Sequence, residues 1–178
     1  MSLRAEHGFS LTESLVAMGI LGAGMLAIAA AFLQGTVQLK GSELDILARE
    51  KAAEAIESVF TARDTRTVQW AQIRNVEGES GGDGGVFRDG ALPLTRPGLD
   101  GLVNTGDDDA AIESLVKPGP DGLLGTGDDD IQELIEFTRE VRIRDVNQSL
   151  RELRVTIRYK VGGATREYAI ATLISSYA

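Results

Sequence analysis

The most prominent feature of the hydropathy pattern is a long run without charge near the start of the chain. Residues 14–33 form twenty consecutive uncharged positions, most of them Leu, Ile, Val, Ala or Gly. As a helix this run would be about 30 Å long, which matches the hydrocarbon core of a bilayer. It has no polar face, whereas a helix on the surface of a soluble core normally has one. The pattern therefore predicts a membrane-spanning helix over 14–33.

The next segment, residues 41–60, is rich in helix formers and has one apolar side. The apolar positions at helical spacing are Leu44, Leu47, Ala48, Ala52, Ala55, Ile56 and Val59. We expect this side to pack on a globular head. Together with the membrane span, it predicts one long N-terminal helix over residues 9–60.

From residue 135 the pattern changes to alternation between apolar and polar positions. In 141–143 and 153–161 the apolar residues occupy odd positions, and arginine or lysine occupies most even ones. Such alternation predicts strands with one buried face. Gly162-Gly163 predicts a tight turn into a third strand over 165–174, and apolar residues on both of its faces predict a central place. We expect a small antiparallel sheet over 135–178 and an α+β fold.

Charge is concentrated in one part of the chain. The protein has 18 basic and 27 acidic residues, and the whole excess of nine negative charges lies between Gly78 and Asp130. This segment also contains all four prolines and 13 of the 21 glycines. It is expected to form an acidic insertion within a loop region, 61–134, that separates the helix from the sheet. The absence of a basic cluster excludes nucleic acid as an expected partner.

The insertion contains a duplicated motif over 97–130. Residues 97–109 (PGLDGLVNTGDDD) and 118–130 (PGPDGLLGTGDDD) align with an offset of 21 and are identical at ten of thirteen positions. Each copy has an aspartate before a turn glycine and three consecutive aspartates seven to nine positions later. Crowded carboxylates repel one another, and calcium accepts six to eight oxygen ligands.

The motif therefore predicts calcium as a cofactor. The expected ligands are Asp100, Asp107, Asp109, Asp121, Asp128 and Asp130. Asp108 and Asp129 alternate with these ligands and are expected to point away from the ion. The spacing is not that of an EF-hand. The alternative is a solvated acidic linker that was duplicated.

The residues before the span carry the most specific signal. Glu13 stands at the start of an apolar helix, where burial of its carboxylate requires a nearby cation. If the chain were cut after Gly8, the new α-amino group of Phe9 on a neighbouring copy would supply that cation. Glu13 would then pair with it in an assembling bundle of helices.

The segment Gly8-Phe9-Ser10-Leu11-Thr12-Glu13 resembles the processing and methylation signature of type IV prepilins. The resemblance implies removal of a leader, residues 1–8, by a membrane prepilin peptidase and N-methylation of Phe9. It also implies a role for Glu13 in methylation and assembly, and a pilin-like lollipop fold. The C-terminal strands resemble those of minor pilins of the PilV class.

These features predict a minor pilin-type subunit without enzymatic activity. It would span the inner membrane once, place its head in the periplasm, and join other pilin subunits in an extracellular filament through its N-terminal helix. A minor pseudopilin of type II secretion is the alternative within the same superfamily. A single-pass, anchored calcium-binding protein that never polymerises is the alternative from another class. An enzyme is not expected, because no nucleophile–base pair, thiolate site or cofactor loop is present.

Overall fold

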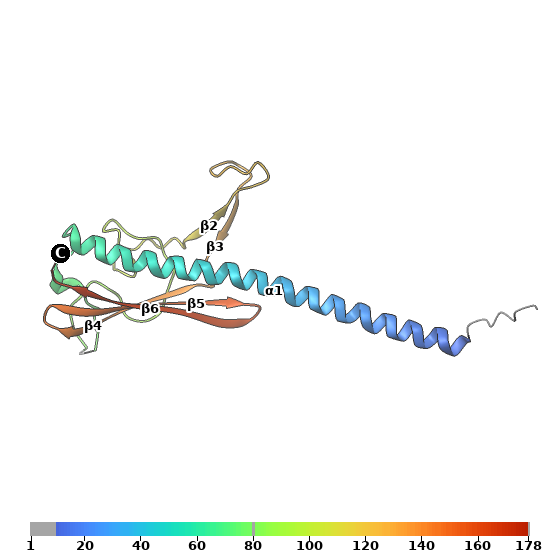
Figure 1. Ribbon diagram of the computed structural model, residues 1–178. Helices are drawn as coiled ribbons and strands as arrows, with labels where there is room; N and C mark the ends of the chain where they lie inside the picture. The colour runs from blue at the N-terminus through green and yellow to red at the C-terminus, as the bar shows by residue number, and fades with distance from the viewer. Residues whose placement is uncertain (1–9, 80, 178) are drawn as a thin grey trace, which may run out of the picture. The chain divides into compact units, whose positions relative to one another are not determined.

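The computed structural model describes residues 10–79 and 81–177. Helix α1 (Leu11–Asp64) is followed by the short 3₁₀ helix η1 (Trp70–Gln72) (Figure 1). The strands are β1 (Leu92–Pro93), β2 (Ser114–Lys117), β3 (Asp130–Glu133), β4 (Thr138–Asn147), β5 (Leu150–Val161) and β6 (Ala164–Ser175). The chain divides into two compact units, one up to Ser42 and one from Glu43 onward. We call the second unit the head.

The head contains a four-stranded antiparallel sheet in the order β1-β4-β5-β6. Strands β2 and β3 pair only with each other, as a separate hairpin. The expected α+β class, with a long N-terminal helix and a small antiparallel sheet, is confirmed. The sheet has one strand more than expected, because the two residues of β1 pair with the start of β4 and extend it beyond the three longer strands.

The expected central place of the third long strand was wrong. β6 lies at the edge of the sheet, and β5 lies between β4 and β6. The inward residues Tyr168 and Ile170 of β6 pack against the core, whereas the outward Ala169, Ala171 and Leu173 are exposed. Apolar residues on both faces therefore reflect an uncovered edge strand here, not a strand buried on both sides.

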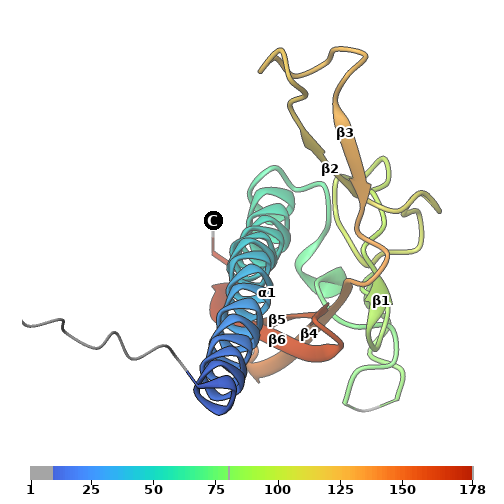
Figure 2. The same ribbon diagram turned by 90° about the vertical axis from the view of Figure 1, so that its right-hand side faces the viewer.

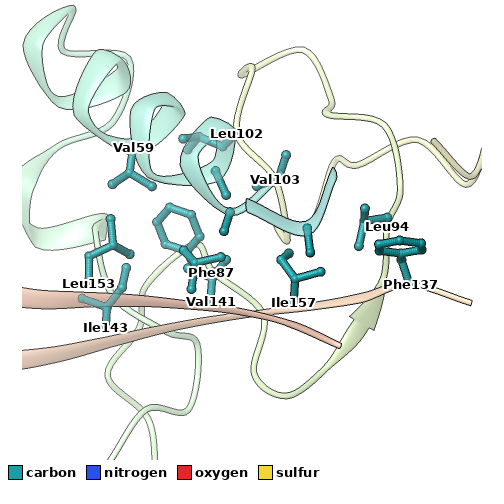
Figure 3. Packing of buried hydrophobic residues seen from close by; sticks show 14 of the residues in the cluster. Val59, Phe87, Leu94, Leu102, Val103, Phe137, Val141, Ile143, Leu153 and Ile157 are labelled. Carbon is teal, nitrogen blue, oxygen red and sulfur yellow. The ribbon is translucent and has the colours of Figure 1, made fainter. Parts of the chain in front are cut away.

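The core lies between the head portion of α1 and the inner face of the sheet. Ala48, Ala52, Ala55 and Val59 of α1 are fully buried, as the helical spacing predicted. The inward residues of β4 and β5 and Phe87 from the preceding loop lie opposite them, as the close-up shows (Figure 3). Small alanines on the helix allow close approach to the sheet, and burial of the larger side chains supplies the main stabilising term.

Two local features hold the β5–β6 hairpin in place. Gly162 and Gly163 both have positive φ, 56° and 86°, which is the backbone of the tight turn that the sequence predicted. At the same end, the Tyr159 hydroxyl donates to the Asp45 carboxylate at 2.5 Å, and Arg166 donates to the same carboxylate at 3.1 Å. Burial and the hydrogen bond to Asp45 raise the pKa of Tyr159 to about 12, so the hydroxyl remains a donor at physiological pH.

Candidate assembly site and duplicated loops

Helix α1 begins with a local arrangement that involves Glu13. The hydroxyl of Ser10 accepts a hydrogen bond from the backbone N–H of Glu13 at 3.3 Å, and the Ser10 carbonyl accepts one from Ser14 at 3.1 Å. Ser10 thus caps the helix, and the Glu13 carboxylate stands in the first turn, where the helix dipole favours negative charge. Gly8 and Phe9 lie outside the described residues.

The first part of α1 presents an unburied apolar surface. Every residue from Leu11 to Lys40 is exposed, including Leu26 and Phe32, which are both 74% accessible. α1 is long and apolar enough to cross a membrane, and no residue of its most apolar 18-residue window is buried. So much exposed apolar surface is unstable in water, so this part of the helix requires a lipid environment or the apolar faces of other helices.

Three glycines in the uncharged stretch of α1, residues 14–33, leave space for a neighbour. A Cβ atom added at Gly19, Gly22 or Gly24 would meet no atom within 4 Å. In an apolar medium, small residues let another helix approach closely, and packing then contributes to association. The segment is therefore chemically suited both to a bilayer and to a bundle of like helices.

The first duplicated loop, 97–109, is a turn braced by its own carboxylates. Asp107 accepts hydrogen bonds from the backbone N–H of Asp100 at 3.3 Å and from the hydroxyl of Thr105 at 2.8 Å. Asp108 accepts from the N–H groups of Asn104 and Thr105 at 2.8 and 3.2 Å. The Thr105 hydrogen bond lowers the pKa of Asp107, because it stabilises the ionised carboxylate.

The second loop, 118–130, reproduces these contacts. Asp128 accepts from Asp121 N–H at 3.3 Å and from the Thr126 hydroxyl at 2.6 Å, and Asp129 accepts from Thr126 N–H at 3.2 Å. The Thr126 hydrogen bond lowers the pKa of Asp128, as Thr105 does for Asp107. The sequence repeat is therefore a structural repeat.

The two copies also share their backbone conformation. Gly101 and Gly122 both have a φ of 71°. The next pair of matching residues with positive φ is Asn104, at 61°, and Gly125, at 86°. Asparagine and glycine are the residues that enter the left-handed region most readily, so this difference between the copies preserves the turn.

The copies differ in what surrounds them. Leu102 and Val103 of the first loop are buried in the core, with exposed fractions of 0% and 2%. Their counterparts Leu123 and Leu124 are 62% and 65% exposed. The second loop lies at the end of the β2–β3 hairpin, and we call residues 114–133 the arm (Figure 2).

A buried ionic network anchors the first loop. Arg139 of β4 is completely buried, and its guanidinium donates to the Asn104 side chain at 2.7 Å and to the Glu113 carboxylate at 3.1 Å. Lys51 of α1 pairs with the other Glu113 oxygen at 2.7 Å. Burial alone would lower the pKa of Lys51, but the hydrogen bonds that it donates to Glu113 and Glu54 raise it.

The structure brings some of the predicted calcium ligands together. Asp100 and Asp107 contact each other in the first loop, and Asp121 and Asp128 do so in the second. Asp109 instead accepts from the N–H of Ala111 at 3.3 Å, outside this pair. Within the described residues, no group of three or more His, Cys, Asp or Glu side chains is arranged as a metal site.

Sequence reasoning missed the residues that shape the loops most directly. Asp108 and Asp129 were expected only to point away from the ion, yet their carboxylates hold the turns together. Arg139 was also missed, although a signal was available. It occupies an odd position in β4, which is the phase of the buried Val141 and Ile143, so its side chain points into the core.

Comparison with known proteins gives one match. Residues 3–29 match the model of the prokaryotic N-terminal methylation motif. No curated protein and no solved structure matches the chain. The matched segment contains Gly8, Phe9 and Glu13 and extends well into the apolar part of α1. In this N-terminal segment the chain is therefore similar to type IV prepilins: it carries the N-terminal methylation motif on a long apolar helix that leads into an α+β head.

Proposed function

We propose that this chain is a minor pilin-type subunit that inserts in the inner membrane and assembles into a type IV pilus-like filament. The observation that carries the proposal is the match of residues 3–29 to the methylation motif at the start of a helix whose apolar half is wholly exposed. Prepilin peptidase would cut between Gly8 and Phe9, and the new N-terminus would be methylated. The head would lie in the periplasm before assembly.

Glu13 is the residue proposed to direct assembly. Its side chain is exposed on the apolar half of α1, so packing of this half among other helices would bury the carboxylate. The free α-amino group of Phe9 on a neighbouring subunit would then neutralise it. Loss of one partner leaves the other charge buried without compensation, which is strongly unfavourable. The interaction therefore selects subunits that have been processed.

The test uses the full chain expressed with its peptidase and filament system. Mass spectrometry should find a mature N-terminus at N-methyl-Phe9, and Gly8→Glu should leave the precursor uncut. Glu13→Ala should enter the membrane in normal amount but fall at least tenfold in sheared filaments. Glu50→Ala, which removes an exposed glutamate from the same helix, is the matched control and should assemble normally. A mature protein that begins at Met1 would overturn the proposal.

Calcium binding by the duplicated loops stays a prediction, with the same six ligands. The support for it is the electrostatics of the first loop: burial and the neighbouring charges of Asp107 and Asp108 raise the pKa of Asp100. A bound cation would relieve this repulsion. Several of the carboxylate oxygens already accept hydrogen bonds from the loop backbone, so calcium would share them with these donors or replace them.

Melting of the full chain in detergent tests the calcium prediction. Metal that binds only the folded state stabilises it by about 2.7 kcal/mol at a hundredfold excess over Kd. The melting temperature should therefore be higher in millimolar calcium than in chelator, and magnesium should substitute poorly. Asp107→Asn combined with Asp128→Asn should remove most of the increase, whereas Glu133→Gln in β3 should retain it. An equal melting temperature in calcium and chelator would refute the prediction.

A further inference from the structure

The second loop, at the end of the arm, exposes an apolar pair whose counterpart in the first loop is buried. The two loops share their hydrogen bonds and their backbone turns, yet Leu102 is fully buried and its counterpart Leu123 is 62% exposed. Leu124 and Ile131 of the arm are also exposed, at 65% and 64%. The first loop shows that this motif is compatible with burial of its apolar pair, whereas the equivalent pair of the second loop, Leu123-Leu124, has no cover within the chain.

The surroundings of this apolar pair are strongly acidic. Asp121, Asp128, Asp129 and Asp130 lie in the loop, and residues 118–130 contain no basic side chain. In Figure 1 the arm lies on the side of α1 opposite the four-stranded sheet, and in Figure 2 it points away from that sheet. A complementary surface would combine apolar contact area with positive charge at its border.

The outer face of the sheet has this composition. Ala169, Ala171 and Leu173 of β6 form an exposed apolar strip on the face turned away from α1. The register places Arg154 directly beside Ala171 and Arg142 beside Arg154. The basic residues that border the strip or lie across the same face are Arg142, Arg144, Arg154, Arg158 and Lys160.

These basic residues are only partly neutralised within the chain. Glu140, Glu152 and Glu167 form ion pairs with the four arginines. The side chains of Arg142 and Arg154 nevertheless remain 65% and 51% exposed. Five basic groups stand against these three glutamates and Glu79, which lines a pocket with Arg142, Arg144 and Arg154, so this face keeps a small positive excess, whereas the loop of the arm is negative. Charge complementarity thus adds to the apolar match.

We infer that the arm of one copy binds the outer sheet face of a second copy of this chain. Leu123 and Leu124 would cover the Ala169–Leu173 strip, and the loop aspartates would face the arginines around it. Because the arm and the strip lie on opposite sides of one head, the contact joins two different surfaces. Such a contact leaves a free arm and a free strip at the ends and can repeat along an open chain of subunits.

The inference rests on the proposed function only for the place where the contact operates, which is between neighbouring heads of a filament. The contact itself requires only two folded heads. Assembly through α1 and contact through the arm use separate surfaces, so each can be removed without the other. The closing experiment uses this separation.

The chain contains no cysteine, so introduced cysteines report single contacts. Two full-length chains with different tags are co-expressed, one carrying Leu124→Cys and the other Ala171→Cys, and treated with a short bis-maleimide reagent. The yield of cross-linked product that carries both tags should exceed the yield from the matched control at least tenfold. In the control, the second chain carries its cysteine at the exposed Glu136, between β3 and β4.

Charge reversal provides the second part of the experiment. Asp128→Lys with Asp130→Lys in the first chain should lower the cross-link at least tenfold. Arg154→Glu with Arg158→Glu in the second chain should then restore at least half of it. A yield no higher than the Glu136→Cys control, or one that charge reversal leaves unchanged, would overturn the inference, as would cross-linking of Leu124→Cys only to other proteins.

The N-terminus of the same samples separates this inference from the proposed function. Chains that begin at N-methyl-Phe9 but give no specific cross-link would count against the contact and leave the pilin proposal in place. Chains that give the cross-link but begin at Met1 would overturn the pilin proposal and support the contact.

Discussion

Glu113→Ala should destabilise the head by about 3 to 5 kcal/mol, which is the usual result of breaking a buried ion pair from one side. Glu113 is 6% exposed, and Arg139 beside it is completely buried. Without the carboxylate, the guanidinium keeps only the neutral oxygens of Asn104 and Thr95 as partners. A buried positive charge with no anion near it is the unfavourable state.

Urea unfolding of the full chain in detergent measures this effect, with the fluorescence of Trp70, the single tryptophan, as the probe. Glu133→Ala, which removes an exposed carboxylate of β3, is the control and should change stability by less than about 0.5 kcal/mol. Glu113→Leu combined with Arg139→Met should cost less than Glu113→Ala, because it removes both charges. If Glu113→Ala were as stable as the unchanged protein, the buried ionic network around Arg139 would not contribute to stability, contrary to this prediction.

The duplicated loops offer a second large effect with an internal control. Leu102→Ala should cost about 2 to 5 kcal/mol, because it leaves a cavity in a packed core. Leu123→Ala is the same substitution at the same position of the same motif, but its side chain is 62% exposed. It should change stability by less than about 0.5 kcal/mol.

The same urea assay compares the two variants side by side. A similar loss in both would mean that the second loop is packed within its own chain, contrary to the exposure of Leu123. If the arm binds a second copy, Leu123→Ala should also lower the cross-link yield while leaving stability unchanged. The first loop would then contribute to the stability of the head, and the second loop to self-association.

The head portion of α1 and the two inner strands of the sheet were predictable because their apolar residues recur with the period of a helix or a strand. Leu153, Val155 and Ile157 occupy successive odd positions of β5 and are all fully buried. Gly162-Gly163 marked the turn into β6 correctly. These signals are local, so a single sequence contains all the information that they require.

The order of strands and the burial of the loops were not predictable in the same way. β6 has apolar residues on both faces, and only the fold decides whether its outer face is covered. The loops have nearly the same sequence, so periodicity cannot tell which one is buried. One signal does differ: Asn104 bonds to Arg139, and the second loop has Gly125 there, which has no side chain for such a bond.

Buried cations were the other weakness of sequence reasoning. Arg151 is 2% exposed, and its guanidinium stacks over Trp70 and donates to the carbonyl of Ile73 at 2.9 Å. Like Arg139, it occupies an odd position on the inner face of its strand. An arginine in the apolar phase of an alternating strand thus indicates a buried network with identifiable acceptors.

The hydrogen-bond register at the base of the second loop has a consequence for how this protein can vary. Lys117 and Asp130 are direct partners across β2 and β3, so the loop between them leaves and re-enters the hairpin at one place. Residues can be added or removed there without displacing either strand, because the closing entropy of a loop changes only slowly with its length. Lineages, or protein engineers, can therefore exchange the tip for another peptide while the core of the head stays constant.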